Sequence, residues 1–221
     1  MVSFLALFGG LTIHEAAGTS LFTFAFTGLL GTWLYQRRRT IDWRVAAPVC
    51  CGALLFGYAG ATIAGRMDPR PLAILIALII LFAGTYIFLP PRTAARTRAG
   101  RGWREQLLLA SVGAGSGFGS GFSGAGGPLF SVPLMLILRY VPLTAVATSQ
   151  VLQIVAATSG SIANYRHDYI DFRVAGIATV FELVGVIVGV KVAHAASALA
   201  LRRLAGALCI ASGAILLARS W

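Results

Sequence analysis

A glycine-rich stretch, residues 113–128, holds the residues of this chain best suited to bind an anion. Eight of its sixteen residues are glycine, and it ends in Gly126-Gly127-Pro128. In a helix interior glycine costs about 1 kcal/mol relative to alanine and proline about 3 kcal/mol, so we expect a helix break here. A helix that restarts after a break presents free N–H groups and a positive dipole end. The predicted anion-binding residues are Ser123, Gly124, Gly126, Gly127 and Pro128.

The same glycines have a second interpretation. Small residues also allow two helices to pack closely in a membrane. Glycine alone would favour this packing role, whereas the Gly-Gly-Pro sequence favours a functional break, and both interpretations stay open at this point.

Polar side chains near the start of two other predicted helices could also contact an anion. Thr-Ser pairs stand at residues 19–20 and 148–149, and Gln153 follows one helical turn after the second pair. Hydroxyl and amide groups donate hydrogen bonds, so we expect substrate contacts from Thr19, Ser20, Thr148, Ser149 and Gln153. The hydroxyls could equally bond a carbonyl of their own helix.

Glu182 is the one acidic residue that falls in the middle of an apolar segment; the other six acids lie at segment ends or in loops. An intramembrane carboxylate marks an ion or proton pathway by default, so Glu182 is a candidate for proton coupling. A neutral structural glutamate, hydrogen-bonded to a neighbouring helix, is the alternative.

An enzyme hypothesis rests on four residues. Gly121-Phe122-Ser123-Gly124 matches the GxSG around the nucleophile of rhomboid-type intramembrane serine proteases, and His194 lies two segments later. A nucleophile needs its base within hydrogen-bonding reach, whereas His194 is expected at a membrane edge. We therefore expect no enzyme. No cofactor or metal site is expected either, because the three cysteines show no CxxC or Cys/His spacing.

The composition indicates the setting of these residues. The 221 residues are 57% hydrophobic and 11% charged, against about 25% charged in soluble domains. A membrane-spanning helix needs about 20 mostly apolar residues, so we expect a polytopic all-α membrane protein. The predicted spans are residues 16–35, 45–65, 72–89, 107–138, 143–165, 174–190 and 204–218.

The net charge of +11 would suggest a nucleic-acid partner in a soluble protein. Here half of the 18 cations fall in two connections, residues 37–44 and 92–104, which two predicted spans separate. Positive loops face the cytoplasm, so both connections are assigned to that side and no nucleic-acid partner is expected.

An internal repeat organises the chain. Ile41-Asp42-Trp43-Arg44-Val45-Ala46 recurs 129 positions later as Ile170-Asp171-Phe172-Arg173-Val174-Ala175, with five of six residues identical. We therefore expect a duplicated four-helix unit. Residues 1–89 form the first repeat, 90–106 a cytoplasmic loop and 107–221 the second repeat. At this offset the glycine-rich stretch of the second repeat has no counterpart in the first repeat. The first repeat therefore lacks its opening half-segment.

The topology of the repeats depends on residues 107–138. If this segment crosses the membrane once, the repeats are parallel, and 12 of the 18 cations lie inside. If it is re-entrant, the repeats are inverted, and 13 lie inside. Charge does not choose between the two.

Several motifs, taken in order, resemble the sulfite exporter TauE/SafE family of membrane transporters. They are Ser120–Pro128, Val132-Pro133-Leu134, Ala145–Ser149 and Ile170-Asp171-Phe172, with Ala17–Ser20 and Ile41-Asp42-Trp43 in the first repeat. The resemblance implies a duplicated helical unit, favours a single crossing by residues 107–138, and implies transport of sulfite, organosulfonates or similar anions.

The hypothesis is thus a multi-pass transporter of the plasma or inner membrane that moves a small, sulfur-containing anion. Its partners are the anion and the lipid bilayer, and a homo-oligomer is compatible with it. An anion channel is the closest rival, and the intramembrane serine protease is a further alternative.

Overall fold

The computed structural model describes residues 1–2, 4–5, 10–88, 102–195 and 197–219, and the regular structure of these residues is helical throughout. The helices are α2 (Ile13–Arg37), α3 (Trp43–Ala64), α4 (Pro69–Phe88), α5 (Trp103–Ser123), α6 (Gly127–Ile137), α7 (Pro142–Tyr165), α8 (Phe172–Ala195) and α9 (Ala198–Arg219). The all-α prediction is confirmed, and α5 begins inside the predicted loop 90–106.

Short polar signals define where the helices begin. Thr12 and Glu15 form a capping box at the start of α2, in which each side chain accepts a hydrogen bond from the backbone N–H of the other. Asp42 caps α3 by accepting from the N–H of Arg44, and Pro142 occupies the first turn of α7.

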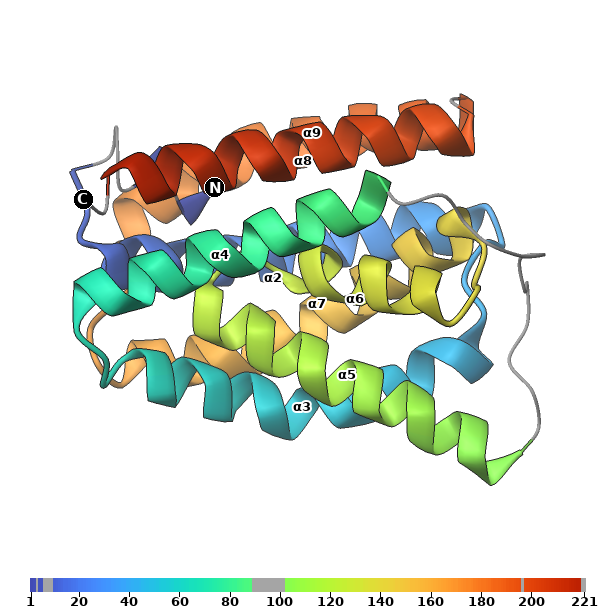
Figure 1. The fold of residues 1–221 in the computed structure, drawn as a ribbon, viewed down its shortest axis with the longest axis horizontal. Helices are drawn as coiled ribbons and strands as arrows, with labels where there is room; N and C mark the ends of the chain where they lie inside the picture. The colour runs from blue at the N-terminus through green and yellow to red at the C-terminus, as the bar shows by residue number, and fades with distance from the viewer. Residues whose placement is uncertain (3, 6–9, 89–101, 196, 220–221) are drawn as a thin grey trace.

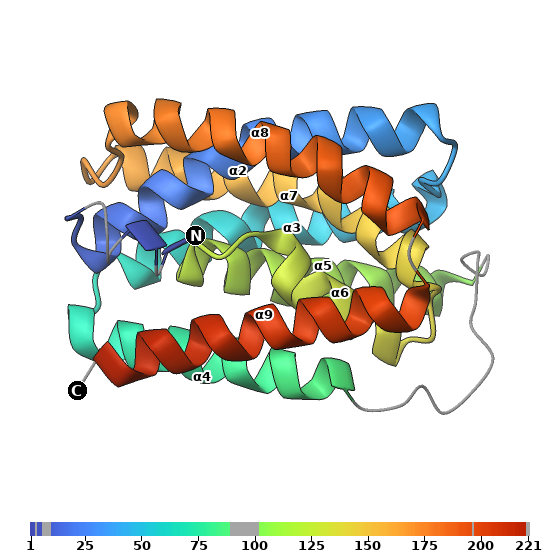
Figure 2. The same cartoon turned by 90° about the horizontal axis from the view of Figure 1, so that it is seen from above.

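The helices lie side by side in a bundle, with their axes roughly along its length (Figures 1 and 2). α2 packs against α7 and α8, α3 packs against α5 and α7, and α4 packs against α9. α2 and α7 are antiparallel, because Leu21 lies near Gly160 at one end of the contact and Gly31 lies near Gln150 at the other.

Polar and apolar side chains are distributed as a bilayer requires. Leu55, Phe82 and Phe181 are more than 70% exposed on the outside of the bundle. Fully buried serine and threonine side chains line its interior: Thr19, Ser20, Thr23, Ser116, Ser120, Ser123, Ser131, Thr148 and Ser149. An apolar exterior of this extent marks a membrane-facing surface rather than a water-facing one.

Among the described residues, two helices are long and apolar enough to span a membrane, Trp43–Ala64 and Phe172–Val192. The sequence predicted seven spans. In α2, α5 and α7 the buried serine, threonine and glycine residues lower the hydropathy of the helix.

Residues 103–140 form a re-entrant hairpin. The Oη of Tyr140, just beyond α6, donates a hydrogen bond of 2.8 Å to Oε1 of Glu105 in the first turn of α5. The segment therefore enters and leaves at the same end of the bundle, and Figure 1 shows α6 running back beside α5.

The single crossing favoured by the family resemblance is wrong, because the chain reverses at the break. The duplication itself stays a prediction, and its helices α2 and α7 run in opposite directions.

Three glycines of α5 bring its backbone against α3. Added Cβ atoms on Gly113 and Gly121 would collide with the carbonyl oxygens of Val49 and Gly57, and one on Gly117 would lie 2.6 Å from Cα of Ala53. The packing interpretation is thus correct for this face of α5, and the functional interpretation stays a prediction for the glycines that follow it.

Alanine substitution at neighbouring glycines of α5 tests this packing. Gly115→Ala should raise thermal stability in detergent, because its Cβ meets no atom within 4 Å and alanine gains about 1 kcal/mol of helix propensity. Gly117→Ala should lower it, because overpacking costs about 1–3 kcal/mol. Shifts of the same sign in both variants would contradict the close contact between α3 and α5.

Candidate functional site

The predicted helix break lies between α5 and α6. α5 ends at Ser123, and Gly124 adopts a left-handed conformation with φ of 63°. Gly126 has φ of 83° and precedes Gly127-Pro128, which open α6. Side chains rarely adopt such positive φ values, so these two glycines allow the chain to reverse. Residues 124–126 are called the hairpin tip below.

The hairpin tip lies against α2, and the start of α6 lies against α7. A Cβ on Gly124 would lie 2.6 Å from Cα of Ala17, and one on Gly126 would lie 3.0 Å from the ring of Phe24. Gly127 touches α7, where a Cβ would collide with the Leu152 side chain. These contacts fix the start of α6 inside the bundle.

The start of α6 has no side-chain cap, since its N-cap residue is Gly126. The first turn of a helix carries N–H groups without partners in the helix, and these concentrate a positive partial charge. α6 has 11 residues, so it extends about 16 Å, roughly half of a bilayer core. Its N-terminus therefore lies deep in the bundle, near its centre in Figure 1.

Gln153 ties α7 to α2 beside the hairpin tip. Its Nε2 donates to the carbonyl oxygen of Phe24 at 3.0 Å and to Oγ1 of Thr27 at 2.7 Å. Phe24 is the residue 129 positions earlier, so this bond joins residues that the predicted repeat makes equivalent. Its amide donors are thus engaged by protein rather than free for an anion.

Three of the predicted hydroxyls have partners within the protein. Oγ1 of Thr19 accepts from the N–H of Asp171 at 3.0 Å, and Oγ of Ser149 donates to the carbonyl of Val146 at 2.7 Å. Oγ of Ser123 donates to the carbonyl of Gly119 at 2.6 Å and accepts from the tip amide of Ala125. These three hydroxyls therefore stabilise the structure of the protein through their hydrogen bonds.

Four other hydroxyl oxygens are fully buried and have no hydrogen-bond partner in the described protein: those of Ser20, Ser116, Ser120 and Thr148. They are called the free hydroxyls below. A buried polar group left without a partner costs about 1–3 kcal/mol, so several of them in one region require an explanation.

The free hydroxyls belong to α5 of the hairpin and to α2 and α7, which contact its tip and the start of α6. Ser20 lies between Ala17 and Phe24 on the face of α2 that contacts the tip. Thr148 lies one turn before Leu152, the α7 residue that touches the start of α6. Ser116 and Ser120 lie on the same face of α5 as Leu109 and Val112. Leu109 and Val112 pack in one core cluster with residues of α6 and α7.

Sequence reasoning missed Ser116 and Ser120. Both stand among the glycines of α5, and their spacing of one helical turn places them on one face. That spacing could have identified them as a pair, but not as groups without partners.

Glu182 lies on α8, which packs against α2. Its carboxyl group lies beside Thr23 of α2. Its second oxygen, Oε2, is buried without a hydrogen-bond partner among the described residues. Ala53, its counterpart in the predicted first repeat, packs against Gly117 of α5.

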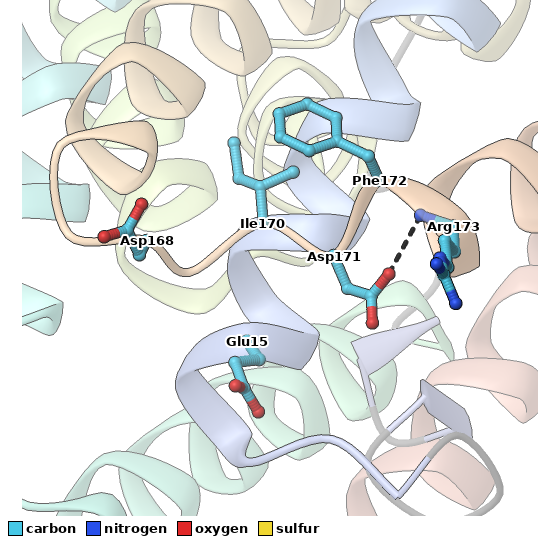
Figure 3. Close-up of a pocket in the computed structure, with 6 residues that line it drawn as sticks. All are labelled: Glu15, Asp168, Ile170, Asp171, Phe172 and Arg173. Carbon is cyan, nitrogen blue, oxygen red and sulfur yellow. Dashed lines mark hydrogen bonds between the residues drawn. The ribbon is translucent and has the colours of Figure 1, made fainter.

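An open pocket lies elsewhere, at the end of the bundle where α2 begins (Figure 3). It is lined by Glu15, Asp168, Ile170, Asp171, Phe172 and Arg173. Three carboxylates against one guanidinium repel an anion. Two of the carboxylates serve as helix caps, since Asp171 accepts from the N–H groups of Arg173 and Val174 and Glu15 belongs to the α2 capping box. The lining of this pocket is therefore poorly suited to an anion.

The described residues contain no group of three or more His, Cys, Asp or Glu side chains that could hold a metal ion. In the protease hypothesis, the proposed nucleophile Ser123 is buried with its hydroxyl proton donated to a backbone carbonyl. The side chain of its proposed base, His194, lies outside the described part of the chain.

Comparison with known proteins gives a consistent assignment. The family model for the sulfite exporter TauE/SafE matches residues 1–216. The chain is 26% identical over 212 residues to a probable membrane transporter protein of Xylella fastidiosa, covering 94% of this chain and 81% of that protein. It is 24% identical over 185 residues to the probable membrane transporter protein YunE of Bacillus subtilis, covering 76% and 68% respectively. No solved structure matches the chain.

The contact between Gln153 and Thr27 can be measured by a double-mutant cycle. Gln153→Leu and Thr27→Val should each destabilise the protein, with a coupling energy of about 0.6 kcal/mol, as for other hydrogen bonds between membrane helices. Denaturation in mixed micelles measures it. Strictly additive effects would show that the bond does not hold α2 against α7.

Proposed function

The chain belongs to the sulfite exporter TauE/SafE family of membrane transporters, and we propose that it moves a small sulfur-containing anion, such as sulfite or an organosulfonate. The anion site is the N-terminus of α6 together with the free hydroxyls. The relatives carry the name of membrane transporters without a substrate, so the class of anion rests on the family description and on the chemistry of the site.

One observation carries the proposal. Hydrogen-bond donors of two kinds belong to the hairpin and to the helices packed around it: the uncapped amides at the start of α6 and the free hydroxyls of α2, α5 and α7. An anion accepts from both, and hydrogen bonds to a charged group contribute about 1.5–3 kcal/mol each. Transporters place half-helix N-termini near the bilayer midplane for anionic groups, and we assign the N-terminus of α6 to that position.

The protein is further proposed to lie in the plasma or inner membrane, with its arginine-rich end in the cytoplasm. The re-entrant hairpin puts the α2–α3 connection and the α6–α7 connection at the same end, and this arrangement assigns 13 of the 18 cations to it. The positive-inside rule then makes that end cytoplasmic.

Cysteine accessibility tests this orientation. In a chain without Cys50, Cys51 and Cys209, Arg166→Cys should react with an impermeant maleimide on intact cells, because Arg166 is exposed at the end opposite the arginine-rich one. Arg38→Cys, exposed at the other end, should react only after permeabilisation. Protection of Arg166→Cys in intact cells would contradict the re-entrant arrangement.

Removal of a free hydroxyl tests the anion site. Ser120→Ala should leave thermal stability unchanged or higher, because no bond within the described protein is lost, yet weaken sulfite binding about tenfold through the loss of one donor to the anion. Ser159→Ala is the matched control, because that buried hydroxyl already donates to the carbonyl of Ala156. Equal sulfite affinity in wild type and Ser120→Ala would refute the assignment.

Flux in proteoliposomes distinguishes the rival functions. Gly127→Leu should abolish sulfite flux while the protein still inserts, because the added side chain collides with Leu152 at the start of α6. A channel would give ionic currents that do not depend on a proton gradient. A serine protease would label Ser123 with a fluorophosphonate probe, and Ser123→Ala would remove that label.

A further inference from the structure

We propose that Thr19 and Thr148 are paired gate residues, each of which accepts a hydrogen bond from the backbone N–H of an aspartate in one of two alternating states. The outer bond, from Asp171 to Thr19, lies at the end where α2 begins and is made in this structure. The inner bond, at the arginine-rich end, would join Asp42 to Thr148. This inference rests on the proposed function, because a gate at each end presupposes transport through the bundle.

The connections that carry the two aspartates share one backbone conformation. Arg39, in the α2–α3 connection, has φ of 51°, and Asp168, 129 positions later in the α7–α8 connection, has φ of 55°. The next residue of each connection, Thr40 or Tyr169, donates its backbone N–H at 3.1 Å to the carbonyl five residues earlier. The two turns are therefore the same local structure at opposite ends of the bundle.

The residues around these turns match at the same offset. Gly10, before α2, has φ of 66°, and Arg139, before α7, has φ of 68°. Both aspartates also cap the helix that follows them, since Asp42 and Asp171 each accept from the N–H two residues later, at 3.0 Å and 2.9 Å. The offset of 129 residues thus relates backbone geometry as well as sequence at these positions.

The two threonines, which are also 129 positions apart, differ in their hydrogen bonds. Oγ1 of Thr19 accepts from the N–H of Asp171 at 3.0 Å. Oγ1 of Thr148 is fully buried and has no hydrogen-bond partner among the described residues, so the matching bond from Asp42 is not made. Because a buried hydroxyl without a partner is costly, we assign the missing partner of Thr148 to the second state.

Packing between α3 and α7 keeps the inner pair at one end of the bundle. Ile41, next to Asp42, belongs to one core cluster with Ala147 and Val151, which flank Thr148 along α7. In transporters built from inverted repeats, one part of the protein rocks against another around a central site, so one end closes as the other opens. Such a movement would exchange the outer bond for the inner one.

Further contacts hold the outer end closed in this structure. The ring of Tyr169 stacks on that of His14 in α2, with centroids 5.2 Å apart, and its hydroxyl donates to the carbonyl of Gly65 at 3.4 Å. A Cβ on Gly18 of α2 would collide with the carbonyl oxygen of Tyr169. The inner counterpart of Tyr169 is Thr40, whose hydroxyl donates to a carbonyl of the helix just before it. Ring stacking and hydrogen bonding at this position thus favour closure of the outer end.

Distances between spin labels measure both ends without a substrate. In a chain without Cys50, Cys51 and Cys209, Gly10→Cys with Asp168→Cys reports the outer end, and Arg139→Cys with Arg39→Cys reports the inner end. All four labelled positions are exposed, and the two pairs are equivalent at the offset of 129. Double electron–electron resonance on protein in nanodiscs gives the distance distribution of each pair.

Loss of the outer bond should shift the population between the two states. Thr19→Val should raise the fraction with the outer labels apart and the inner labels close about two- to tenfold, because one neutral hydrogen bond of the observed state is lost. Adding Thr148→Val should reverse the shift, since the other state then loses its bond as well. Thr19→Ser should behave as wild type. Thr158→Val is the control, because that exposed hydroxyl of α7 donates to a carbonyl of its own helix.

A stronger variant covers a second state that is too rare to detect in wild type. Gly18→Ala with Thr19→Val removes two outer contacts, and unchanged distances at both ends in this variant overturn the gate. A shift that Thr148→Val does not reverse overturns the pairing of the two threonines. Both results leave the anion site in place, whereas failure of wild type to bind or move sulfite overturns the proposed function while the label distances still decide the gate.

Discussion

The interruption of the helix between α5 and α6 is the constraint on which the rest of the structure depends. Backbone N–H groups cannot be left exposed to lipid, so a break at this depth has to be enclosed by protein. The glycines of α5 allow that helix to lie directly on α3, and α2 and α7 close around the hairpin tip at Ala17, Phe24 and Leu152. Gln153 then holds α7 to the backbone of α2 beside it.

Because protein encloses the break, the distribution of polarity is the reverse of that in a soluble protein: polar residues lie inside and apolar residues outside. The helices that surround the break carry serine, threonine and glycine on their buried faces, and large apolar residues such as Phe181 cover the outside. Polar interiors reduce the hydropathy of α2, α5 and α7, whereas α3 and α8 are apolar over a full membrane-spanning length. The groups that suit an anion are thus the groups that make these helices less typical of membrane spans.

The helix break could be predicted from the sequence, whereas the reversal of the chain and the hydrogen-bond partners of the hydroxyls could not. Gly-Gly-Pro is a local signal, so the break could be located from propensity alone. The reversal of the chain could not, because the two topologies differ by one cation and the deciding contact joins Glu105 to Tyr140. The partner of a hydroxyl is equally non-local: Thr19 accepts from Asp171, 152 residues later, whereas Ser20 beside it has no partner among the described residues.

The short length of α6 has an electrical consequence. Since its N-terminus is reached after about half the bilayer thickness, an anion that moves from either side to that point crosses about half of the membrane potential. For one elementary charge this corresponds to about 1.2 kcal/mol per 100 mV, or about a sevenfold change in affinity. For the proposed anion site, the position of this 11-residue helix implies that occupancy depends on membrane voltage and that the electrical work of transport is divided almost equally between entry and exit.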